Sequence, residues 1–441
     1  MKVYLEFTGC RLNQSEIETL ARQFRQAGHQ IAGSAGEAEL CVVNTCAVTN
    51  EATRSSRNLI RRLNRSNPNA RIIATGCYAE LAPQAVGALP GVETVVGNGD
   101  KDRLVPLVLG DDQPPAVYDR EPLEREALPG ALGRTRAFVK VQDGCDNRCT
   151  FCVTTIARGP GRSRPLADVV REVQMLVEAG YQEAVLTGVH LGSYGHDHGQ
   201  ANGLELLVRA ILAHTDLPRL RLSSLEPWDL SPDFFRLWED ARLCRHLHLP
   251  LQSGCDTTLK RMARRTNGAS FRALVDAARQ QIPDLAVSTD VIVGFPGETE
   301  AEFETSLAFI REMEFMKLHV FRYSRRPGTA AARMPGHISE DAKKARSARL
   351  LALSDEGGRR FAERFVGREV SVLWENVTGA TPDGFVNSGL TDHYVRVELI
   401  SPDVLTNCIT SVCAVARDGL ALKAVPCGTD RTAPAGRGDT Q

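Results

Sequence analysis

The sequence is poor in lysine and in net charge, and it lacks long apolar runs. Only 8 of its 53 basic residues are lysine, and 54 acidic residues bring the formal net charge to -1. This balance excludes binding of nucleic acid through bulk positive charge and leaves only local arginine patches. No stretch of roughly 18 apolar residues occurs, and the opening MKVYLEFTGC lacks the basic and apolar regions of a secretory signal. We therefore expect a cytoplasmic protein that does not enter a membrane.

Length and composition predict several globular domains. The chain has 441 residues, 42% of them apolar and 24% charged, which corresponds to about three domains of ~150 residues. It also has 12 cysteines. In a reducing compartment cysteines are more often ligands than disulfides. Six of the twelve fall into two sets with ligand-like placement, and we expect these six to be ligands.

The most informative stretch runs from Val141 to Cys152 and carries Cys145, Cys149 and Cys152 in a C-x3-C-x2-C array. Closely spaced cysteines hold iron–sulfur clusters, whereas zinc sites normally have four ligands. No further Cys or His lies between Leu132 and Val189. Three thiolates leave one iron of a cluster without a protein ligand, and an open position is typical of a reactive centre. Three buried core cysteines, or half of a zinc site, are the alternatives.

A second set of three cysteines follows strand-like segments in the first ~110 residues. Segments over 3–7, 39–43 and 71–74 alternate with helical ones, which predicts a parallel, doubly wound sheet. These segments lead into Cys10, Cys46 and Cys77, and sites in such sheets form at the carboxyl ends of the strands. We expect the three thiols to converge there, with a chance coincidence as the alternative. Cys41 lies within its strand and is expected to be a small buried core residue.

Arginines recur on one face of the helix expected between Cys46 and Cys77. Their spacing of i, i+3, i+7 and i+11 aligns the guanidinium groups of Arg54, Arg57, Arg61 and Arg65. Such a stripe can follow a phosphate backbone. A solvated helix face without function is the alternative.

Six further strand-like segments with helices between them follow, over residues 138–142, 184–190, 220–224, 246–251, 286–294 and 318–323. Six βα units are too few for a closed eight-stranded barrel, so they predict a partial barrel with its site at the carboxyl ends of the strands. The Cys145 array follows the first strand. Glycines at the other strand ends let the backbone approach a ligand, and polar side chains there can bind it, namely Glu226, Gln252, Ser253 and Asp290. A turn role is the alternative for each.

The rest of the chain predicts a helix over residues 339–364 and a small antiparallel β-barrel with strands over 370–374, 394–399 and 412–425. The fold class is thus α/β, with domains over 1–110, 134–362 and 363–427, a linker over 111–133 and a disordered tail over 428–441. Among the remaining cysteines, Cys408, Cys413 and Cys427 match no ligand spacing, and the sequence assigns no role to Cys244 and Cys255.

The Cys145 array, with Phe151 before Cys152, resembles the signature of radical S-adenosylmethionine (SAM) enzymes. Residues 9–13, 43–50 and 75–79 resemble the amino-terminal domain of the methylthiotransferase family, and residues 387–392 resemble the RNA-binding TRAM module. The resemblance implies two [4Fe–4S] clusters, a SAM-cleaving cluster on Cys145, Cys149 and Cys152 and an auxiliary, sulfur-donating cluster on Cys10, Cys46 and Cys77. It also implies SAM-binding segments that contain Thr187, Gly188, Glu226, Gln252, Ser253, Gly254 and Asp290.

Within the family, residues 44–50, 224–226, 246–254 and 318–333 resemble the branch that modifies N6-threonylcarbamoyladenosine beside the tRNA anticodon. The implied reaction removes hydrogen from C2 of the adenine and inserts a methylthio group. The implied partners are tRNA, an electron donor such as flavodoxin or ferredoxin, and a sulfur source. Relatives that act on isopentenyladenosine in tRNA or on an aspartate of a ribosomal protein are rivals. An electron carrier or a zinc-dependent RNA-binding protein is a non-enzymatic rival.

The threonylcarbamoyl group carries a carboxylate, a hydroxyl and a ureido group, so its pocket needs a cation and hydrogen-bond donors. Arginines near the expected mouth of the partial barrel, at the carboxyl ends of its strands, meet this need. They are Arg158 and Arg162 after the cluster loop and Arg322, Arg325 and Arg326 after the last strand. No comparable set of apolar side chains for a prenyl group stands there. Arg158, Arg325 and Arg326 join the helical stripe as candidate RNA contacts.

Overall fold

A parallel sheet of five strands, in the order β2-β1-β3-β4-β5, forms the first part of the chain. The computed structural model describes residues 1–110 and 135–427, so the predicted linker and tail lie outside the described residues. The strands are β1 Lys2–Phe7, β2 Gln30–Ile31, β3 Leu40–Thr45, β4 Arg71–Gly76 and β5 Val92–Val95. The helices are α1 Arg11–Gln26, α2 Asn50–Ser66, α3 Cys77–Leu81, α4 Pro83–Gly87 and α5 Leu104–Leu109, with 3-10 turns η1 Ala35–Glu37 and η2 Lys101–Arg103.

The central strands of this sheet are covered on both faces. Every residue of β3 is buried, as expected for a strand of a doubly wound sheet with helices on both sides. Two apolar clusters fill the faces, one around Phe24 and Leu40 and the other around Ile60 and Ile72. Cys41 is fully buried in β3, which confirms its expected place in the core. Helix α2 begins where the Thr49 side chain accepts a hydrogen bond from the Ala52 N–H.

Six parallel strands of the second part form an open arc in the order β6-β9-β10-β11-β12-β13. Two three-stranded sheets, β10-β9-β6 and β11-β12-β13, are joined by parallel bridges from Leu220 to Leu243 and from Ser224 to His248. The strands are β6 Arg136–Lys140, β9 Glu183–Thr187, β10 Arg219–Leu222, β11 His246–His248, β12 Ala286–Val293 and β13 Lys317–Arg322. This arc confirms the predicted partial barrel.

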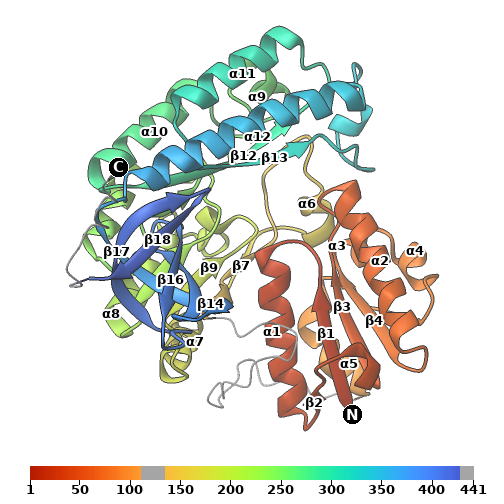
Figure 1. Cartoon of the computed structure of the whole chain (residues 1–441). Coiled ribbons are helices and arrows are strands. Elements are labelled where there is room, and N and C mark those ends of the chain that lie inside the picture. The colour runs from red at the N-terminus through yellow and green to blue at the C-terminus, as the bar shows by residue number, and fades with distance from the viewer. Residues whose placement is uncertain (111–134, 428–441) are drawn as a thin grey trace, which may run out of the picture. The chain divides into compact units, whose positions relative to one another are not determined.

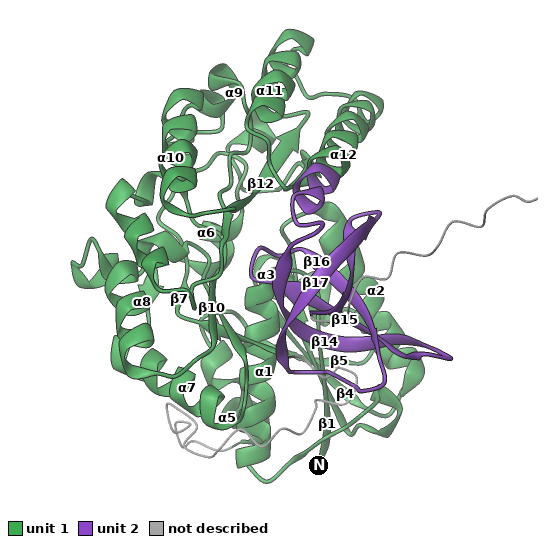
Figure 2. Cartoon of the chain, turned by 60° about the vertical axis from the view of Figure 1, so that its left-hand side comes forward, with its two compact units in different colours: residues 1–357 green, residues 358–441 purple. Residues whose placement is uncertain are grey.

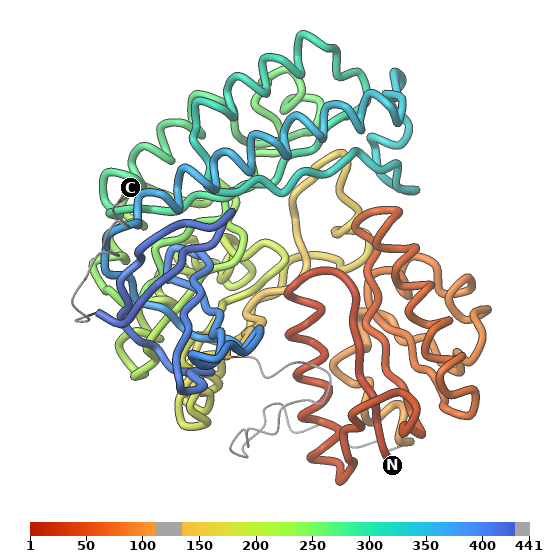
Figure 3. Tube along the Cα trace, in the orientation of Figure 1, coloured from red at the N-terminus to blue at the C-terminus, as the bar shows by residue number. Residues whose placement is uncertain are grey.

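Helices α7, α8, α10, α11 and α12 alternate with these strands, and their apolar faces share one core with the arc (Figures 1 and 3). The helices are α6 Thr154–Arg158, α7 Leu166–Glu178, α8 Gly203–His214, α9 Asp256–Arg261, α10 Gly268–Gln281, α11 Glu300–Glu312 and α12 Glu340–Glu363. The shorter elements are β7 Gln142–Asp143, β8 Arg162–Ser163, η3 Leu191–Ser193, η4 His196–His198, η5 Pro227–Asp229, η6 Pro232–Glu239 and η7 Ala331–Arg333. Capping boxes at Asn267 and Thr299 set the starts of α10 and α11.

The chain divides into two compact units, residues 1–357 and residues 358–441 (Figure 2). The five-stranded sheet and the arc both belong to the first unit. The second unit contains a closed five-stranded barrel in the order β14-β15-β16-β18-β17. Its strands are β14 Glu369–Thr381, β15 Gly384–Thr391, β16 Arg396–Ser401, β17 Ile409–Asp418 and β18 Ala421–Pro426.

The barrel differs from the sequence prediction in its strands. The single strand expected over residues 412–425 is two strands, because Gly419 turns the chain at a φ of 60°. Strand β15 was not predicted, and β16 pairs with β18 in parallel while the other neighbours are antiparallel. Asn407 takes a φ of 65°, and its N–H donates to the Trp374 carbonyl at 2.8 Å. Asn is among the residues that tolerate this conformation best, so the turn forms without glycine.

Cysteine pairing in the barrel also departs from expectation. Cys413 on β17 and Cys427 just after β18 form a disulfide, with Cα atoms 5.2 Å apart. The two strands are neighbours, with Cys413 opposite Val425, so the pairing follows from the strand register. The expectation that cysteines are more often ligands than disulfides in a reducing compartment does not hold for this pair. Cys244 and Cys255 are buried free thiols, and Cys408 is exposed.

Candidate functional site

The Cys145 array forms a loop between β7 and α6 at the carboxyl end of the first strand of the arc. Gly144 has a φ of 72°, and a Cβ atom at this position would collide with the Pro160 carbonyl. The Cys145 N–H donates to the Gly159 carbonyl at 3.0 Å, and the Thr150 N–H donates to the Met262 carbonyl at 3.0 Å. Because backbone hydrogen bonds tie the loop to distant parts of the arc, its conformation is fixed by the fold.

A buried arginine lies beside the second cysteine of the array. The Arg264 Nη1 atom is 3.6 Å from the Cys149 Sγ atom, and the same guanidinium binds Glu226, with Nη2 to Oε2 at 2.6 Å. Its Nη2 atom also donates to the Pro250 carbonyl at 2.6 Å, and its Cζ lies 4.4 Å from the Trp228 ring. Burial raises the pKa of Cys149 to about 11, and Arg264 opposes this shift. Arg264 was not predicted, because it lies in an Arg pair that no motif distinguishes.

His190 lies beside the first cysteine of the array and was also missed as a single residue, although it falls in the predicted strand-end segment after β9. Its Nε2 atom is 2.5 Å from the Asp229 carboxylate. Burial alone would lower the pKa of His190, but the contacts with Asp229 and Cys145 outweigh it and raise the pKa to about 10. Asp229 and Cys145 thus favour the protonated form of His190. No spacing rule connects His190 to Asp229, 39 residues later.

The predicted SAM-binding residues differ in the contacts that their polar groups make. Glu226 and Asp290 remain partly exposed, the first paired with Arg264 and the second with His248 at 3.2 Å. Ser253 and Gly254 pack against α11, where the Gly254 N–H donates to the Ser306 hydroxyl at 2.8 Å.

The other predicted residues of this group sit at strand ends. Gln252 pairs with β12 through its backbone and has a φ of 74°. Thr187 ends β9 and Gly188 follows it, and the Thr187 carbonyl accepts from the Val141 N–H at 2.9 Å. The structure thus gives Ser253, Gly254 and Gln252 packing or backbone roles, and SAM contact remains a prediction for all seven residues.

The second set of cysteines is assembled from three strand ends. Cys10 precedes α1, Cys46 follows β3 and Cys77 begins α3 directly after β4. Because β1, β3 and β4 are parallel neighbours, all three thiols stand at one edge of the sheet. Gly9 has a φ of 94°, and a Cβ atom there would lie 2.5 Å from the Cys46 Sγ. Burial raises the pKa of Cys46 to about 11, with the Arg158 charge acting in the opposite direction.

Both sets consist of thiols alone, at a loop and at strand ends. Thiolates are the ligands that iron–sulfur clusters take. The all-cysteine donors at loops and strand ends therefore fit [4Fe–4S] clusters.

The two cysteine sets lie on parts of the first unit that contact each other. Helix α6, which follows Cys152, contacts α3, which begins at Cys77. Figures 1 and 3 show this junction between the yellow α6 segment and the orange helices of the first sheet. Asn98 donates to the Ala157 carbonyl at 2.7 Å, and Arg326 donates to Asn50 at 2.6 Å and to Thr53 at 3.1 Å. These contacts hold the sheet with Cys10, Cys46 and Cys77 against the arc.

The candidate RNA-binding arginines divide into exposed and buried groups. Arg54, Arg61 and Arg65 are exposed and Arg57 is half-buried. In the described chain these four guanidinium groups make no ion pair. Arg162, Arg322 and Arg325 are also exposed. The prediction is wrong for Arg158 and Arg326, which are 4% and 7% exposed and use their donors inside the protein. Sequence position placed both near the mouth but could not show that their side chains turn inward.

Comparison with known proteins agrees with this architecture. Residues 139–310 match the model of the Radical SAM superfamily, and residues 2–97 match the model described as uncharacterized protein family UPF0004. A solved structure of the radical SAM methyltransferase TsrM from Kitasatospora setae has a TM-score of 0.56 at 17% identity, covering 75% of this chain and 73% of that one. At this identity the likeness concerns the fold alone.

Closer relatives define the family. The threonylcarbamoyladenosine tRNA methylthiotransferase of Bacillus subtilis is 38% identical, with 88% of each chain covered. The protein of the same name from Thermotoga maritima is 39% identical, with 90% of this chain and 91% of the relative covered. The chain therefore belongs to the methylthiotransferase family of radical SAM enzymes. As an enzyme of this family it uses SAM and [4Fe–4S] clusters. Among the described residues no helix is both long and apolar enough to span a lipid bilayer.

Proposed function

We propose that this enzyme methylthiolates C2 of N6-threonylcarbamoyladenosine at position 37 of tRNA. The observation that carries the proposal is the likeness, over nearly the whole chain, to relatives named for this reaction. Two separate three-cysteine sets in one compact unit support it, because the reaction needs both a SAM-cleaving centre and a sulfur-carrying centre. Methylthiolation of isopentenyladenosine or of a ribosomal protein aspartate is the alternative within the same family.

We assign the SAM-cleaving cluster to Cys145, Cys149 and Cys152 and the auxiliary cluster to Cys10, Cys46 and Cys77. When bound, the first supplies the electron that cleaves SAM and the second supplies the sulfur. Around the first, the described residues fix the loop, place Arg264 beside Cys149 and place His190 beside Cys145. A small electron-transfer protein such as flavodoxin or ferredoxin and a separate sulfur source complete the reaction.

The exposed arginines supply a surface for tRNA. The stripe of Arg54, Arg57, Arg61 and Arg65 runs along α2, which begins four residues after Cys46, so phosphate contacts here would bring RNA close to the auxiliary site. The barrel of the second unit resembles a TRAM module, and we assign RNA binding to residues 363–427, with residues 134–362 as the radical SAM core. We expect an enzyme with a tRNA substrate to act in the cytoplasm.

Recognition of the threonylcarbamoyl group requires a cation for its carboxylate. With Arg158 and Arg326 buried, the candidates are the exposed Arg162, Arg322 and Arg325. An anticodon loop exposes the base edge at a lower cost than a duplex would, because its bases are more easily unstacked.

Mass spectrometry of tRNA nucleosides from cells with and without the gene tests the proposal. We expect the methylthio derivative of threonylcarbamoyladenosine to disappear when the gene is removed and to return with the wild-type gene. A Cys46→Ala gene should fail to restore it. If the nucleoside persists without the gene, or if only the isopentenyl derivative disappears, the proposed substrate is wrong.

A further inference from the structure

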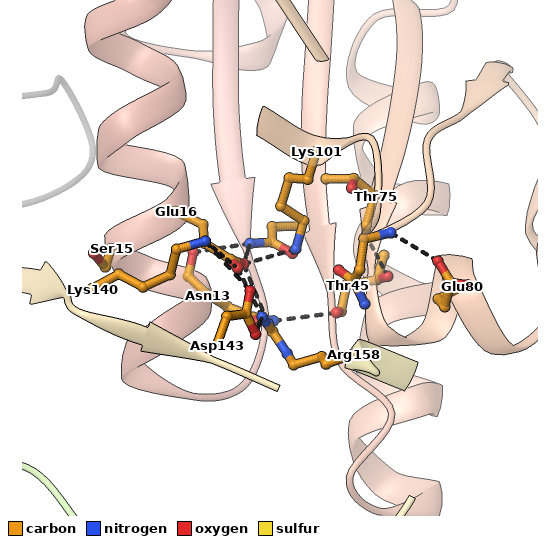
Figure 4. A network of polar contacts seen from close by, with 12 residues as sticks. Asn13, Ser15, Glu16, Thr45, Thr75, Glu80, Lys101, Lys140, Asp143 and Arg158 are labelled. Atoms are coloured by element: carbon orange, nitrogen blue, oxygen red, sulfur yellow. Dashed lines mark hydrogen bonds and ion pairs between the residues drawn. The ribbon is translucent and has the colours of Figure 1, made fainter. Parts of the chain in front are cut away.

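A group of five charged side chains, which we call the junction network, lies where the two parts of the first unit meet (Figure 4). Its members come from both parts of the first unit, namely Glu16 on α1, Lys101 on η2, Lys140 on β6, Asp143 on β7 and Arg158 on α6. Glu16, Lys101 and Arg158 are each 4% exposed. Removing charges from water is expensive, and replacing a buried ion pair by apolar residues often costs no stability. Stability alone therefore does not explain a buried network of this size.

Arg158 is the member that reaches both cysteine loops. Its Nη1 atom donates to Glu16 at 2.8 Å and to Asp143 at 3.0 Å. Asp143 in turn accepts the Gly144 N–H at 2.8 Å, directly before Cys145. The Arg158 Nη2 atom donates at 2.9 Å to Asn13 Oδ1, an oxygen that lies 3.6 Å from the Cys10 Sγ. One guanidinium thus connects the loop of Cys145 with the loop of Cys10.

The junction network contains three cations and two carboxylates, and the exposed carboxylate of Asp102 lies 3.9 Å from Lys140. Burial would raise the pKa of Glu16, but Lys101 and Arg158 outweigh it and hold the pKa well below its usual value. Burial lowers the pKa of Lys101. A guanidinium does not lose its proton in proteins. Arg158 is therefore a cation whose charge is assured, and its Nη2 atom binds the Asn13 oxygen that lies 3.6 Å from the Cys10 Sγ.

A fixed charge beside an iron–sulfur cluster changes its reduction potential. Net charge and hydrogen bonds around a cluster set that potential, and a charge acts more strongly in a protein interior than in water. A nearby cation favours the reduced form because reduction adds negative charge. A nearby carboxylate has the opposite effect.

We propose that Arg158 is a positioning residue that holds the two cysteine loops together and raises the reduction potential of the cluster on Cys10, Cys46 and Cys77. This inference rests on the proposed assignment of that cluster. The same inference predicts that the Glu16 carboxylate, which belongs to the same network, lowers the reduction potential of this cluster. Substitutions of Arg158 and Glu16 should therefore shift the reduction potential in opposite directions.

The test uses full-length protein in which Cys145, Cys149 and Cys152 are all changed to Ala, so that only the auxiliary cluster remains. Into this background we introduce Arg158→Gln, Arg158→Lys or Glu16→Gln, and the midpoint potential is measured by a redox titration followed by electron paramagnetic resonance. We expect a more negative potential for Arg158→Gln, a less negative one for Glu16→Gln, and a value near the parent for Arg158→Lys. Arg221→Gln is the matched control, because Arg221 is 2% exposed and pairs with Glu183 at 2.7 Å away from both cysteine sets.

A merely structural role would move both charge-removing variants in the same direction or leave both unchanged, and either result overturns the proposal. If Arg158→Gln fails to fold, the predicted shift of Glu16→Gln toward a less negative value still decides the electrostatic claim. If the background protein holds no cluster, the proposed assignment of Cys10, Cys46 and Cys77 as cluster ligands is wrong. An intact cluster with unchanged potentials contradicts only the inference about Arg158.

Discussion

The two cysteine sets are built in different ways. Cys145, Cys149 and Cys152 stand within eight residues on one loop, so local backbone geometry brings them together. Cys10, Cys46 and Cys77 are separated by more than thirty residues each, and only the parallel pairing of β1, β3 and β4 places them at one edge. The first site depends on a loop conformation, whereas the second depends on the tertiary structure of a whole sheet.

The polar surroundings of the two sets differ in the same way. Arg264, which lies beside Cys149, binds partners from the arc alone, namely Glu226 and Pro250. Arg158, which lies beside the second set, comes from the arc but binds Glu16 and Asn13 of the first sheet. The set of Cys10, Cys46 and Cys77 thus has a charged neighbour from the other part of the unit, and its properties should depend on how the two parts fit together.

The largest expected effect separates the tasks of the two sets. Cys149→Ala should reduce cleavage of SAM to background, because it removes a ligand of the SAM-cleaving cluster. Cys46→Ala should still release 5′-deoxyadenosine but form no methylthiolated nucleoside. Both products can be quantified by liquid chromatography and mass spectrometry from one reaction with tRNA. Normal product formation by Cys46→Ala would mean that the second set is structural.

The second prediction concerns the glycine that directly precedes the first cysteine of each set. A side chain is strained at the positive φ of Gly144 and Gly9 and would also collide there, with Pro160 and Cys46 respectively. After anaerobic reconstitution the wild type should hold about eight irons as two cubanes. Each Gly→Ala variant should lose about half of this iron, as expected for one cubane of the pair. Gly144→Ala should also lose SAM cleavage, whereas Gly9→Ala should keep it.

Gly28→Ala is the control for this pair, since Gly28 also has a positive φ but a Cβ atom there meets open space. It should retain the full iron content. Equal loss of iron from all three variants would show that the effect comes from backbone strain in general and not from the sites.

A smaller effect is expected from removal of residues 365–441, which contain the barrel. Binding of tRNA should weaken and its salt dependence should become shallower, by about 0.9 in the logarithmic slope for each phosphate that the barrel neutralises. Uncoupled SAM cleavage should stay largely intact, because both cysteine sets lie in residues 1–357. An unchanged dissociation constant across a salt series would refute the assignment of RNA binding to the barrel.

The smallest predicted effect concerns the arginine stripe of α2. Arg57→Gln with Arg61→Gln should reduce the salt slope of tRNA binding by up to about 1.8, at ~0.9 for each neutralised phosphate. The matched control is Arg209→Gln on α8, whose side chain is exposed and pairs only locally with Glu205. A slope equal to that of the control would identify the stripe as a solvated face.

Much of this architecture could be predicted from the sequence, and the two cysteine sets show why. The C-x3-C-x2-C spacing defines the first set directly, and the rule that parallel strands end at one edge was enough for the second. The partial barrel followed from counting βα units. Strand β15 and the break at Gly419 were missed, because short barrel strands carry a weak alternating pattern.

The inward-facing polar residues could not be predicted. Arg158 and Arg326 were assigned to the mouth by their position after a strand, but long side chains can turn into a junction between domains. The pairs His190 with Asp229 and Arg264 with Glu226 join residues almost forty positions apart. Nothing in the local sequence marks such pairs, since they arise only when distant loops come together in the fold.

The measurement that tests the account most directly gives the enzyme two substrates in one reaction. The reaction contains two forms of one anticodon stem-loop, taken from a tRNA that reads codons beginning with A. One form has threonylcarbamoyladenosine at position 37, and the other has isopentenyladenosine there. The account predicts a methylthio product on the threonylcarbamoyl substrate and none on the isopentenyl one. A methylthio product only on the isopentenyl substrate would contradict the proposed function while leaving the two cysteine sets in their separate roles.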